Sequence, residues 1–234
     1  MIDAFHVVNG KDIPELFFED ERTENKGIRL TENLFRLLEG EQINSLAPEV
    51  EARWRLVETA WDLKIARNLI AVSYDPDSQL ITTTKENRRV NVTSCRDALN
   101  GYQKGRCFYC FRTISITGGN SELADVDHFF PHILKGTGIA NPIDGVWNLV
   151  LSCTDCNRGE QGKSACIPTL ALLERLNRRN DYLVRSHHPL QETLKNQTGG
   201  SKVARREFLQ ENYAQALQLL IHTWEPEFAS DPTF

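Results

Sequence analysis

Apolar residues recur every three or four positions in the first third of the chain, which predicts two amphipathic helices. The first would lie within 31–40, with a threonine at its start and a glycine at its end. The second would extend over about 49–72, with Pro48 in its first turn. Trp54 and Trp61 share one face of this helix, so we expect them in the core rather than on a surface that stacks bases.

β-branched residues and turn formers mark the next elements. Residues 1–27 are acidic and mixed, and we expect a loop there, with a short element at most. Segments 80–84 and 88–92 flank a short polar connection and predict a β-hairpin. A turn at 74–78 precedes this hairpin, and a short helix over about 96–103 follows it.

The remainder of the chain predicts a small mixed centre followed by helices. The expected elements are strand-like runs at 113–117, 123–129 and 146–151, a helix start at 154–159, and helices from Pro168 to about Asn180 and from about Lys202 to Trp224. The pattern therefore predicts an α+β protein. We divide it into an N-terminal region of helices and a hairpin (1–93), a central core (94–166) and a helical C-terminal region (167–234).

Composition and charge limit the possible functions. The 234 residues can bury a core, as one domain with appendages or as two small domains. A net charge of −5 argues against tight unaided binding to DNA. The charge is uneven, because residues 1–60 carry 13 acidic and 7 basic side chains, whereas 161–206 carry 3 acidic and 9 basic ones. The basic segment would suit phosphate contacts, although solvated helix faces explain each of its residues equally well.

Two Cys-x-x-Cys pairs, Cys107/Cys110 and Cys153/Cys156, bracket the central segment. Each pair presents two thiolates to one ion, and four cysteines complete a tetrahedral zinc site without an open position for water. A redox role is disfavoured, because no βαβ pattern surrounds either pair. We therefore expect a structural zinc ion whose binding contributes folding free energy. Cys95 and Cys166 are expected to be free thiols.

The sequence predicts a cytoplasmic protein without a membrane segment. Its longest unbroken apolar run, 107–111, is far shorter than the roughly 20 residues that span a bilayer. Residues 1–10 contain neither a basic region nor a long apolar region of the kind found in secretory signals. In the cytoplasm thiols stay reduced, which favours metal binding over disulfides.

An acidic residue and a histidine stand together between the Cys pairs. His128 directly follows Asp127, and an imidazole with a pKa of about 6.5 is suited to general-base work. Asp127 and Asn157 offer oxygen ligands for Mg²⁺, which takes few protein ligands and keeps several waters. Asn157 follows Cys156 directly, so a zinc ion would also fix the position of Asn157.

The segment from Cys107 to Lys163 resembles the HNH endonuclease family, which has a ββα-metal fold, and in particular the subgroup with asparagine in place of the last histidine. The resemblance rests on the Cys pairs, an Asp-His-x-x-Pro block at 127–131, an Asn-Leu-x-Leu-Ser-Cys-x-x-Cys-Asn block at 148–157 and the following Lys163. It implies a ββα-metal core with structural zinc. The residue pattern adds N-terminal helices with a β-hairpin before this core and helices after it.

The resemblance also implies roles for single residues. His128 would be the general base, Asp127 and Asn157 would bind a catalytic Mg²⁺ or Mn²⁺, and Asn148 would tie the loop and orient His128. Asn157 at the last position leaves the preferred ion open. One ion fits this ligand count better than two, so each site should cut one strand per event.

Several residues near this set have alternative explanations. Asp125 shares a strand face with Asp127 and could be an alternative ligand, whereas His132 favours a surface or capping role. Arg158 and Lys163 could contact substrate phosphates or belong to a solvated helix face.

We therefore expect a metal-dependent endonuclease that hydrolyses phosphodiester bonds of DNA, with double-stranded DNA favoured. The resemblance implies the effector subunit of a bacterial anti-phage or restriction-type system, with a protein partner such as an ATPase or sensor subunit. The alternative is a zinc-stabilised adaptor that binds nucleic acid or protein and has a silent nuclease site. The intact motif argues against the adaptor, and the acidic N-terminal segment argues for a partner.

Overall fold

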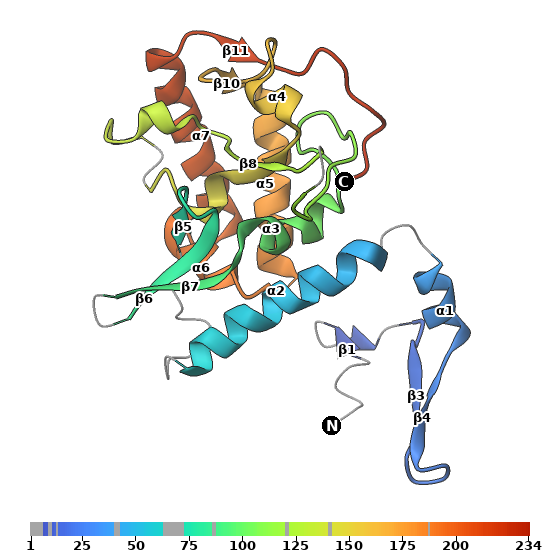
Figure 1. The fold of residues 1–234 in the computed structure, drawn as a ribbon. Coiled ribbons are helices and arrows are strands. Elements are labelled where there is room, and N and C mark those ends of the chain that lie inside the picture. The colour runs from blue at the N-terminus through green and yellow to red at the C-terminus, as the bar shows by residue number, and fades with distance from the viewer. Residues whose placement is uncertain are drawn as a thin grey trace. The chain divides into compact units, whose positions relative to one another are not determined.

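Helices and small sheets alternate along the chain, so the protein belongs to the α+β class that the sequence predicts (Figure 1). The computed structural model describes residues 7–8, 11–12, 14–39, 43–62, 73–85, 88–119, 122–139, 142–186 and 188–234. The chain folds into two units, residues 1–46 and 47–234. The three regions that we expected at 1–93, 94–166 and 167–234 stay a prediction.

The first unit contains short antiparallel strand pairs and a helix. Its elements are β1 (Val7–Val8), β2 (Lys11–Asp12), β3 (Phe18–Glu21), β4 (Gly27–Leu30) and α1 (Glu32–Leu38). The β3–β4 hairpin occupies a segment where we expected a loop. Arg29 on β4 forms ion pairs with Glu19 and Glu21 on β3, the second at 2.8 Å. Opposite charges across two strands stabilise their pairing, so a polar sequence forms a hairpin here.

Helix α2 (Ile43–Asp62) begins earlier than the sequence pattern predicts. Ala52 and Leu56, one turn apart, are buried, whereas Trp54 is 47% exposed. The prediction that Trp54 lies in the core is therefore wrong, because a neighbouring face of the helix packs inward. The side chain of Trp61 lies outside the described part of the chain.

A three-stranded antiparallel sheet follows α2. Its strands are β5 (Ser73–Asp75), β6 (Leu80–Lys85) and β7 (Arg88–Ser94). The pairing of β6 with β7 confirms the predicted hairpin, and β5 adds a strand where the sequence suggested only a turn. Helix α3 (Cys95–Gln103) continues from β7 and packs against β9 and α5, which are described below. The predicted end of the preceding helix, 63–72, lies outside the described residues.

The centre of the second unit is a two-stranded sheet followed by a short helix. Its elements are β8 (Asp125–His128), the 3-10 turns η3 (His132–Leu134) and η4 (Val146–Asn148), β9 (Leu149–Ser152) and α4 (Thr154–Arg158). β8 and β9 run antiparallel, with His128 opposite Leu149. Side chains alternate along a strand, so Asp125 and Asp127 share one face of β8 and His128 takes the other. The strand predicted at 113–117 forms only isolated bridges.

Three C-terminal helices pack against one another beside this centre (Figure 1). They are α5 (Leu170–Arg185), α6 (Gln191–Thr198) and α7 (Lys202–Leu219). α5 extends beyond the predicted end near Asn180, α6 was not predicted, and α7 ends before the predicted Trp224. After α7, β11 (Thr223–Trp224) lies parallel to β10 (Ile167–Pro168) and returns the chain to the centre.

Aromatic side chains join the C-terminal helices to the centre. Phe130, which follows β8, packs against Trp147 in η4, with ring centroids 5.7 Å apart. Trp147 in turn meets Phe208 of α7 edge-on at 4.9 Å. Phe130 and Trp147 are fully buried. Because aromatic rings contribute large buried apolar areas, these contacts hold the ends of β8 and β9 in place.

Candidate metal centre and catalytic site

Four cysteine side chains from two separate segments meet in the second unit. The Sγ atoms of Cys107, Cys110, Cys153 and Cys156 all lie within 4.8 Å of one another, and all four residues are buried. Hydrogen bonding within the cluster lowers the pKa of Cys110, and that of Cys153 to about 7. The same contacts raise the pKa of Cys107 and Cys156. Four soft ligands in one buried cluster fit a metal such as zinc, as the spacing predicts.

The first Cys pair lies on a tight turn after α3. Phe111 has a left-handed φ of 60°, and its N–H donates to the Cys107 carbonyl at 3.0 Å. Arg175 of α5 donates to the carbonyls of Phe108 and Tyr109, the second at 2.8 Å. The Arg175 guanidinium also lies 4.1 Å from the centroid of the Phe111 ring. Helix α5 therefore fixes the turn that supplies two of the four ligands.

The last residues of the chain also contact the first Cys pair. The Ser230 N–H donates to the Cys110 carbonyl at 2.8 Å. The Trp224 indole donates to the Gln161 carbonyl at 2.7 Å and packs edge-on against Tyr109, with ring centroids 5.2 Å apart. The C-terminal segment is therefore part of the frame around the cysteine cluster.

Asp127 is buried, and both of its carboxylate oxygens have protein partners. The Tyr109 hydroxyl donates to Oδ2 at 2.6 Å, and the Lys163 ammonium lies 3.3 Å from Oδ1. Burial raises the pKa of the Asp127 carboxyl, although Lys163 and Tyr109 act in the opposite direction. Each oxygen keeps one further lone pair, so a metal ion at Asp127 would share the carboxylate with Tyr109 and Lys163.

Lys163 is a buried cation, with a side chain that is only 1% exposed. Its ammonium also donates to the His128 carbonyl at 3.0 Å, which ties it to the backbone of β8. A phosphate contact requires an accessible ammonium, and this placement offers none. Arg158, by contrast, is exposed at the end of α4.

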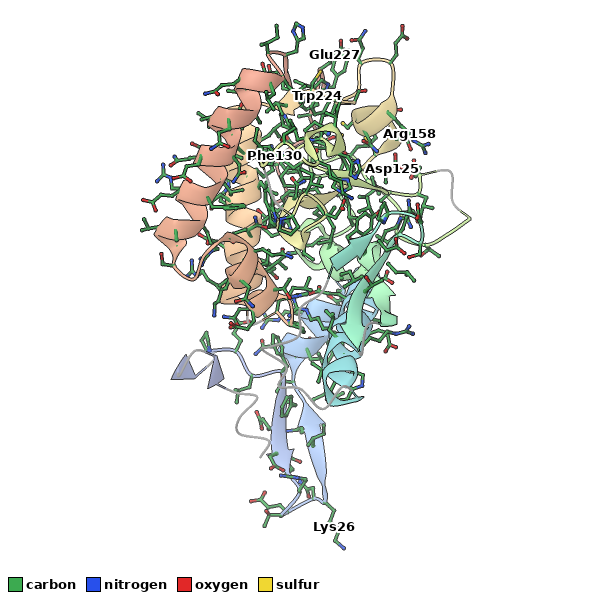
Figure 2. The ribbon with its side chains drawn as sticks, turned by 90° about the vertical axis from the view of Figure 1, so that its left-hand side faces the viewer. Lys26, Asp125, Phe130, Arg158, Trp224 and Glu227 are labelled. Atoms are coloured by element: carbon green, nitrogen blue, oxygen red, sulfur yellow. The ribbon has the colours of Figure 1, made fainter. Side chains whose placement is uncertain are left out.

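Asn157 on α4 lies beside Asp125 rather than Asp127. Its amide Nδ2 donates to Asp125 Oδ2 at 3.1 Å, and the Arg158 Nε donates to the same oxygen at 3.0 Å. Asp125 and Arg158 appear as neighbours in Figure 2. The Asp125 side chain is 17% exposed and that of Asp127 only 8%, so Asp125 is the more accessible carboxylate.

Asn148 is fully buried and uses its amide to join two segments. Its Oδ1 accepts from the Phe130 N–H at 2.7 Å, and its Nδ2 donates to the Phe130 carbonyl at 3.0 Å. Nδ2 also donates to the Ile143 carbonyl at 2.9 Å. Asn148 therefore ties the residues after β8 to the loop that precedes η4.

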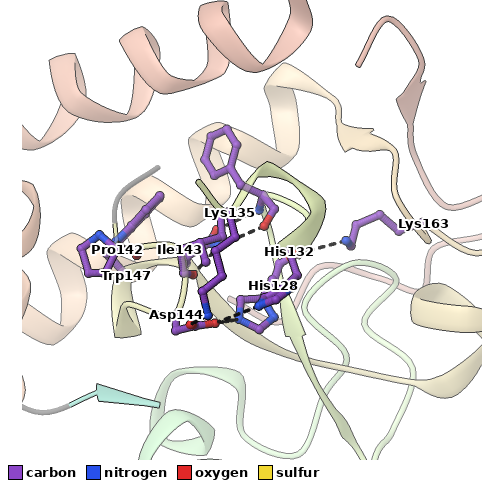
Figure 3. A network of polar contacts seen from close by, with 10 residues as sticks. His128, His132, Lys135, Pro142, Ile143, Asp144, Trp147 and Lys163 are labelled. Carbon is purple, nitrogen blue, oxygen red and sulfur yellow. Dashed lines mark hydrogen bonds and ion pairs between the residues drawn. The ribbon is translucent and has the colours of Figure 1, made fainter. Parts of the chain in front are cut away.

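His128 lies at the end of β8 and faces a carboxylate from that loop. Its Nε2 is 3.0 Å from Asp144 Oδ1, and the Lys135 ammonium is 2.9 Å from Asp144 Oδ2 (Figure 3). The Nε2 of His132 lies farther away, 3.7 Å from Asp144 Oδ1. Burial lowers the pKa of His128 and outweighs the opposite effect of Asp144. The imidazole is therefore predominantly neutral at physiological pH.

The four predicted catalytic residues gather around β8 but point in different directions. Asp127 and His128 occupy opposite faces of the strand, and Asn157 lies near the Asp127 face beside Asp125. Asp144 was not singled out by the sequence analysis, because it lies in a loop without a motif. Its only signal was an acidic residue shortly before the Trp147-Asn148 block.

The basic segment 161–206 provides less cationic surface than its composition suggests. Among its basic residues, Lys163, Arg179 and Arg205 are buried. Arg205 forms an ion pair with Asp181 at 2.6 Å, and Arg175 holds the first Cys pair as described above. These side chains stabilise the fold and are unavailable to a phosphate backbone.

Within the described residues, no helix has the length and apolar character that crossing a membrane requires. Comparisons with protein families, curated proteins and solved structures gave no match for this chain.

Proposed function

We propose that the protein is a metal-dependent endonuclease of the HNH type that hydrolyses phosphodiester bonds of DNA. The observation that carries this proposal is the order of β8, β9 and α4, two antiparallel strands followed directly by a short helix, next to the buried cysteine cluster. This order supports the ββα-metal core that the motif resemblance implies. In this proposal the cysteines hold zinc and the surrounding polar residues carry out hydrolysis.

His128 is the proposed general base that takes a proton from the attacking water. Its imidazole is kept neutral by burial, and its side chain is 12% exposed, so one edge reaches solvent. A positioned general base typically contributes about 10²–10⁴-fold to a rate. Asn148 supports this role by fastening the segment that follows His128.

Asn157 is the proposed ligand of a catalytic Mg²⁺ or Mn²⁺, together with Asp125 or Asp127. The residue types fit such an ion, because Mg²⁺ needs only one or two protein carboxylates. The Asn157 Nδ2 now donates to Asp125 Oδ2 at 3.1 Å, so the amide would turn its Oδ1 toward the bound ion. The bound ion would supply charge relief at the phosphate and at the leaving oxygen. The exposed Arg158 places a positive charge beside the same carboxylate, where a phosphate can approach.

The biological setting proposed for this activity follows from the resemblance. We propose a cytoplasmic effector that nicks one strand of double-stranded DNA per event, within a bacterial anti-phage or restriction-type system. The net charge of −5 favours a protein partner, such as an ATPase or sensor subunit, that helps to bind DNA. Several of the basic side chains in 161–206 are buried, so a partner would have to contribute to DNA binding.

A zinc-stabilised adaptor with a silent nuclease site is the second candidate. The observation that favours it is Asp127, whose two oxygens are already engaged by Tyr109 and Lys163. An adaptor would keep the cysteine cluster and these contacts without binding a second ion.

A cleavage panel tests the two candidates against each other. Purified protein is incubated with single-stranded DNA, plasmid DNA or RNA, each with Mg²⁺, Mn²⁺ or Zn²⁺. We expect nicking of the plasmid with Mg²⁺ or Mn²⁺, and a loss of at least about 100-fold in His128→Ala. His222→Ala, which removes an exposed histidine outside the site, should cut like the wild type.

Zinc content should be unchanged in both variants, and both should keep a cooperative unfolding transition. Equal nicking by the wild type and His128→Ala would reject the proposed mechanism. A folded, zinc-loaded protein that cuts none of the substrates would instead support the adaptor.

A further inference from the structure

We infer that Asp144 is a positioning residue that fixes the tautomer and orientation of His128, so that Nδ1 is the nitrogen that accepts the proton from water. This inference rests on the proposed function, since it assigns a partner to the proposed general base. It is carried by the geometry of the loop before η4, which lies between the two motif blocks at 127–131 and 148–157.

The Asp144 carboxylate is held by a well-fastened loop. The Gly145 N–H donates to the Pro142 carbonyl at 2.9 Å, and the Trp147 indole donates to the same carbonyl at 3.2 Å. The Tyr74 N–H donates to the Asp144 carbonyl at 3.4 Å. A side chain at Gly145 would meet the Trp147 ring at 2.6 Å, so the tight passage requires glycine. Hydrogen bonds on both sides of Asp144 therefore fix the backbone that carries its carboxylate.

The two oxygens of Asp144 have different partners. Oδ1 lies 3.0 Å from His128 Nε2, and Oδ2 lies 2.9 Å from the Lys135 ammonium (Figure 3). Partial burial raises the pKa of Asp144, but the hydrogen bonds from Lys135 and His128 outweigh it, and the pKa lies below its ordinary value. Asp144 is therefore an ionised acceptor whose charge is balanced by Lys135.

An ionised carboxylate has no proton to donate, so the contact with His128 requires a proton on Nε2. In the neutral imidazole, the other nitrogen then carries the lone pair. No hydrogen bond joins Nδ1 to any residue in the part of the chain that the structure describes.

The test combines kinetics with nuclear magnetic resonance of the full chain. Long-range ¹H–¹⁵N spectra of histidine-labelled protein report which ring nitrogen carries the proton, and the His128 signals are assigned by their loss in His128→Gln. We expect the Nε2–H tautomer in the wild type. Asp144→Asn, whose amide can donate as well as accept, should shift His128 toward a mixture of tautomers.

For plasmid cleavage, we expect Asp144→Asn to lower kcat by about 100-fold and to change KM by less than about threefold. Asp155→Asn, which changes an exposed carboxylate paired with Arg112, is the matched control and should leave both values unchanged. Asp144→Ala removes the hydrogen bond to His128 without introducing a new donor. Thermal unfolding of each variant shows whether the fold is intact.

A wild-type protein that cuts DNA and shows the Nδ1–H tautomer would overturn the inference alone. So would an Asp144→Asn variant with wild-type kcat. If the wild type cuts no substrate in any metal, the proposed function fails and the assignment of Asp144 to a general base fails with it.

Discussion

Lys163 carries a buried ammonium, and Asp127 is the carboxylate beside it. The two groups lie 3.3 Å apart, and the Tyr109 hydroxyl completes the surroundings of Asp127. When one partner of a buried ion pair is removed, the other charge is left without compensation. This pair therefore links the turn of the first Cys pair, β8 and the segment after α4.

We predict that Asp127→Ala lowers the free energy of unfolding by about 3–5 kcal/mol, because it leaves the Lys163 ammonium unpaired in the interior. Urea denaturation monitored by Trp fluorescence measures this change. Asp125→Ala is the matched control on the same strand face. Its ion pair with Arg158 is partly exposed and should contribute less than about 1 kcal/mol.

Replacing both Asp127 and Lys163 tests whether the unpaired charge causes the loss of stability. The double variant Asp127→Leu with Lys163→Met removes both charges and should recover most of the lost stability. If Asp125→Ala and Asp127→Ala lowered the free energy of unfolding equally, the stabilising role of the buried Asp127–Lys163 pair would be contradicted. The prediction also bears on mechanism, because lost cleavage in an Asp127 variant cannot be assigned to metal binding unless the fold is intact.

At the scale of elements, helix α5 supports both halves of the candidate site. Arg175 holds the turn of the first Cys pair, and Arg179 reaches the segment that leads into β9. Arg179 donates to the carbonyls of Val146, Trp147 and Leu149 at 3.2, 3.1 and 2.7 Å. Burial lowers the pKa of Arg179 to about 10, so it still carries its charge at pH 7.

We predict that Arg179→Met lowers the free energy of unfolding by about 2–4 kcal/mol, because it removes three hydrogen bonds between a charged buried guanidinium and backbone carbonyls. Arg178→Met changes the exposed neighbour on the same helix. Its free energy of unfolding should stay within about 0.5 kcal/mol of the wild type. Amide hydrogen exchange should also accelerate in β9 of Arg179→Met. Equal stability of the two variants would show that α5 does not support this segment through Arg179.

At the scale of the whole molecule, the cysteine cluster connects distant parts of the second unit. Cys107 and Cys110 follow α3, whereas Cys153 and Cys156 lie at the start of α4. Binding of a metal to such a cluster contributes directly to folding free energy. Loss of the metal should therefore affect the second unit as a whole.

We predict one bound zinc ion per chain, measured by elemental mass spectrometry, since the four cysteines form a single closed site. Chelation, or Cys110→Ser, should remove the zinc and abolish the cooperative thermal transition of the second unit. Cys166→Ser changes a cysteine outside the cluster and should keep both the bound zinc and the cooperative transition. An unchanged transition after complete zinc removal would contradict a structural metal.

Features that depend on neighbouring residues could be predicted from the amino-acid pattern alone. The spacing of Cys107/Cys110 and Cys153/Cys156 predicted the cysteine cluster, and the hairpin of β6 and β7 followed from β-branched residues on either side of a turn. The helical pattern indicated α5 and α7 but not their ends, because caps and packing decide where a helix stops.

The packing of distant segments determines which side chains turn inward and which partners they meet. Trp54 is exposed because another face of α2 packs inward, and Arg179 is buried with its guanidinium bonded to carbonyls of η4 and β9. Asp144 reaches His128 across a loop, and Asn157 meets Asp125 across the gap between α4 and β8. Such contacts depend on segments far apart in the chain, whose approach is fixed by packing and not by any local pattern of residues.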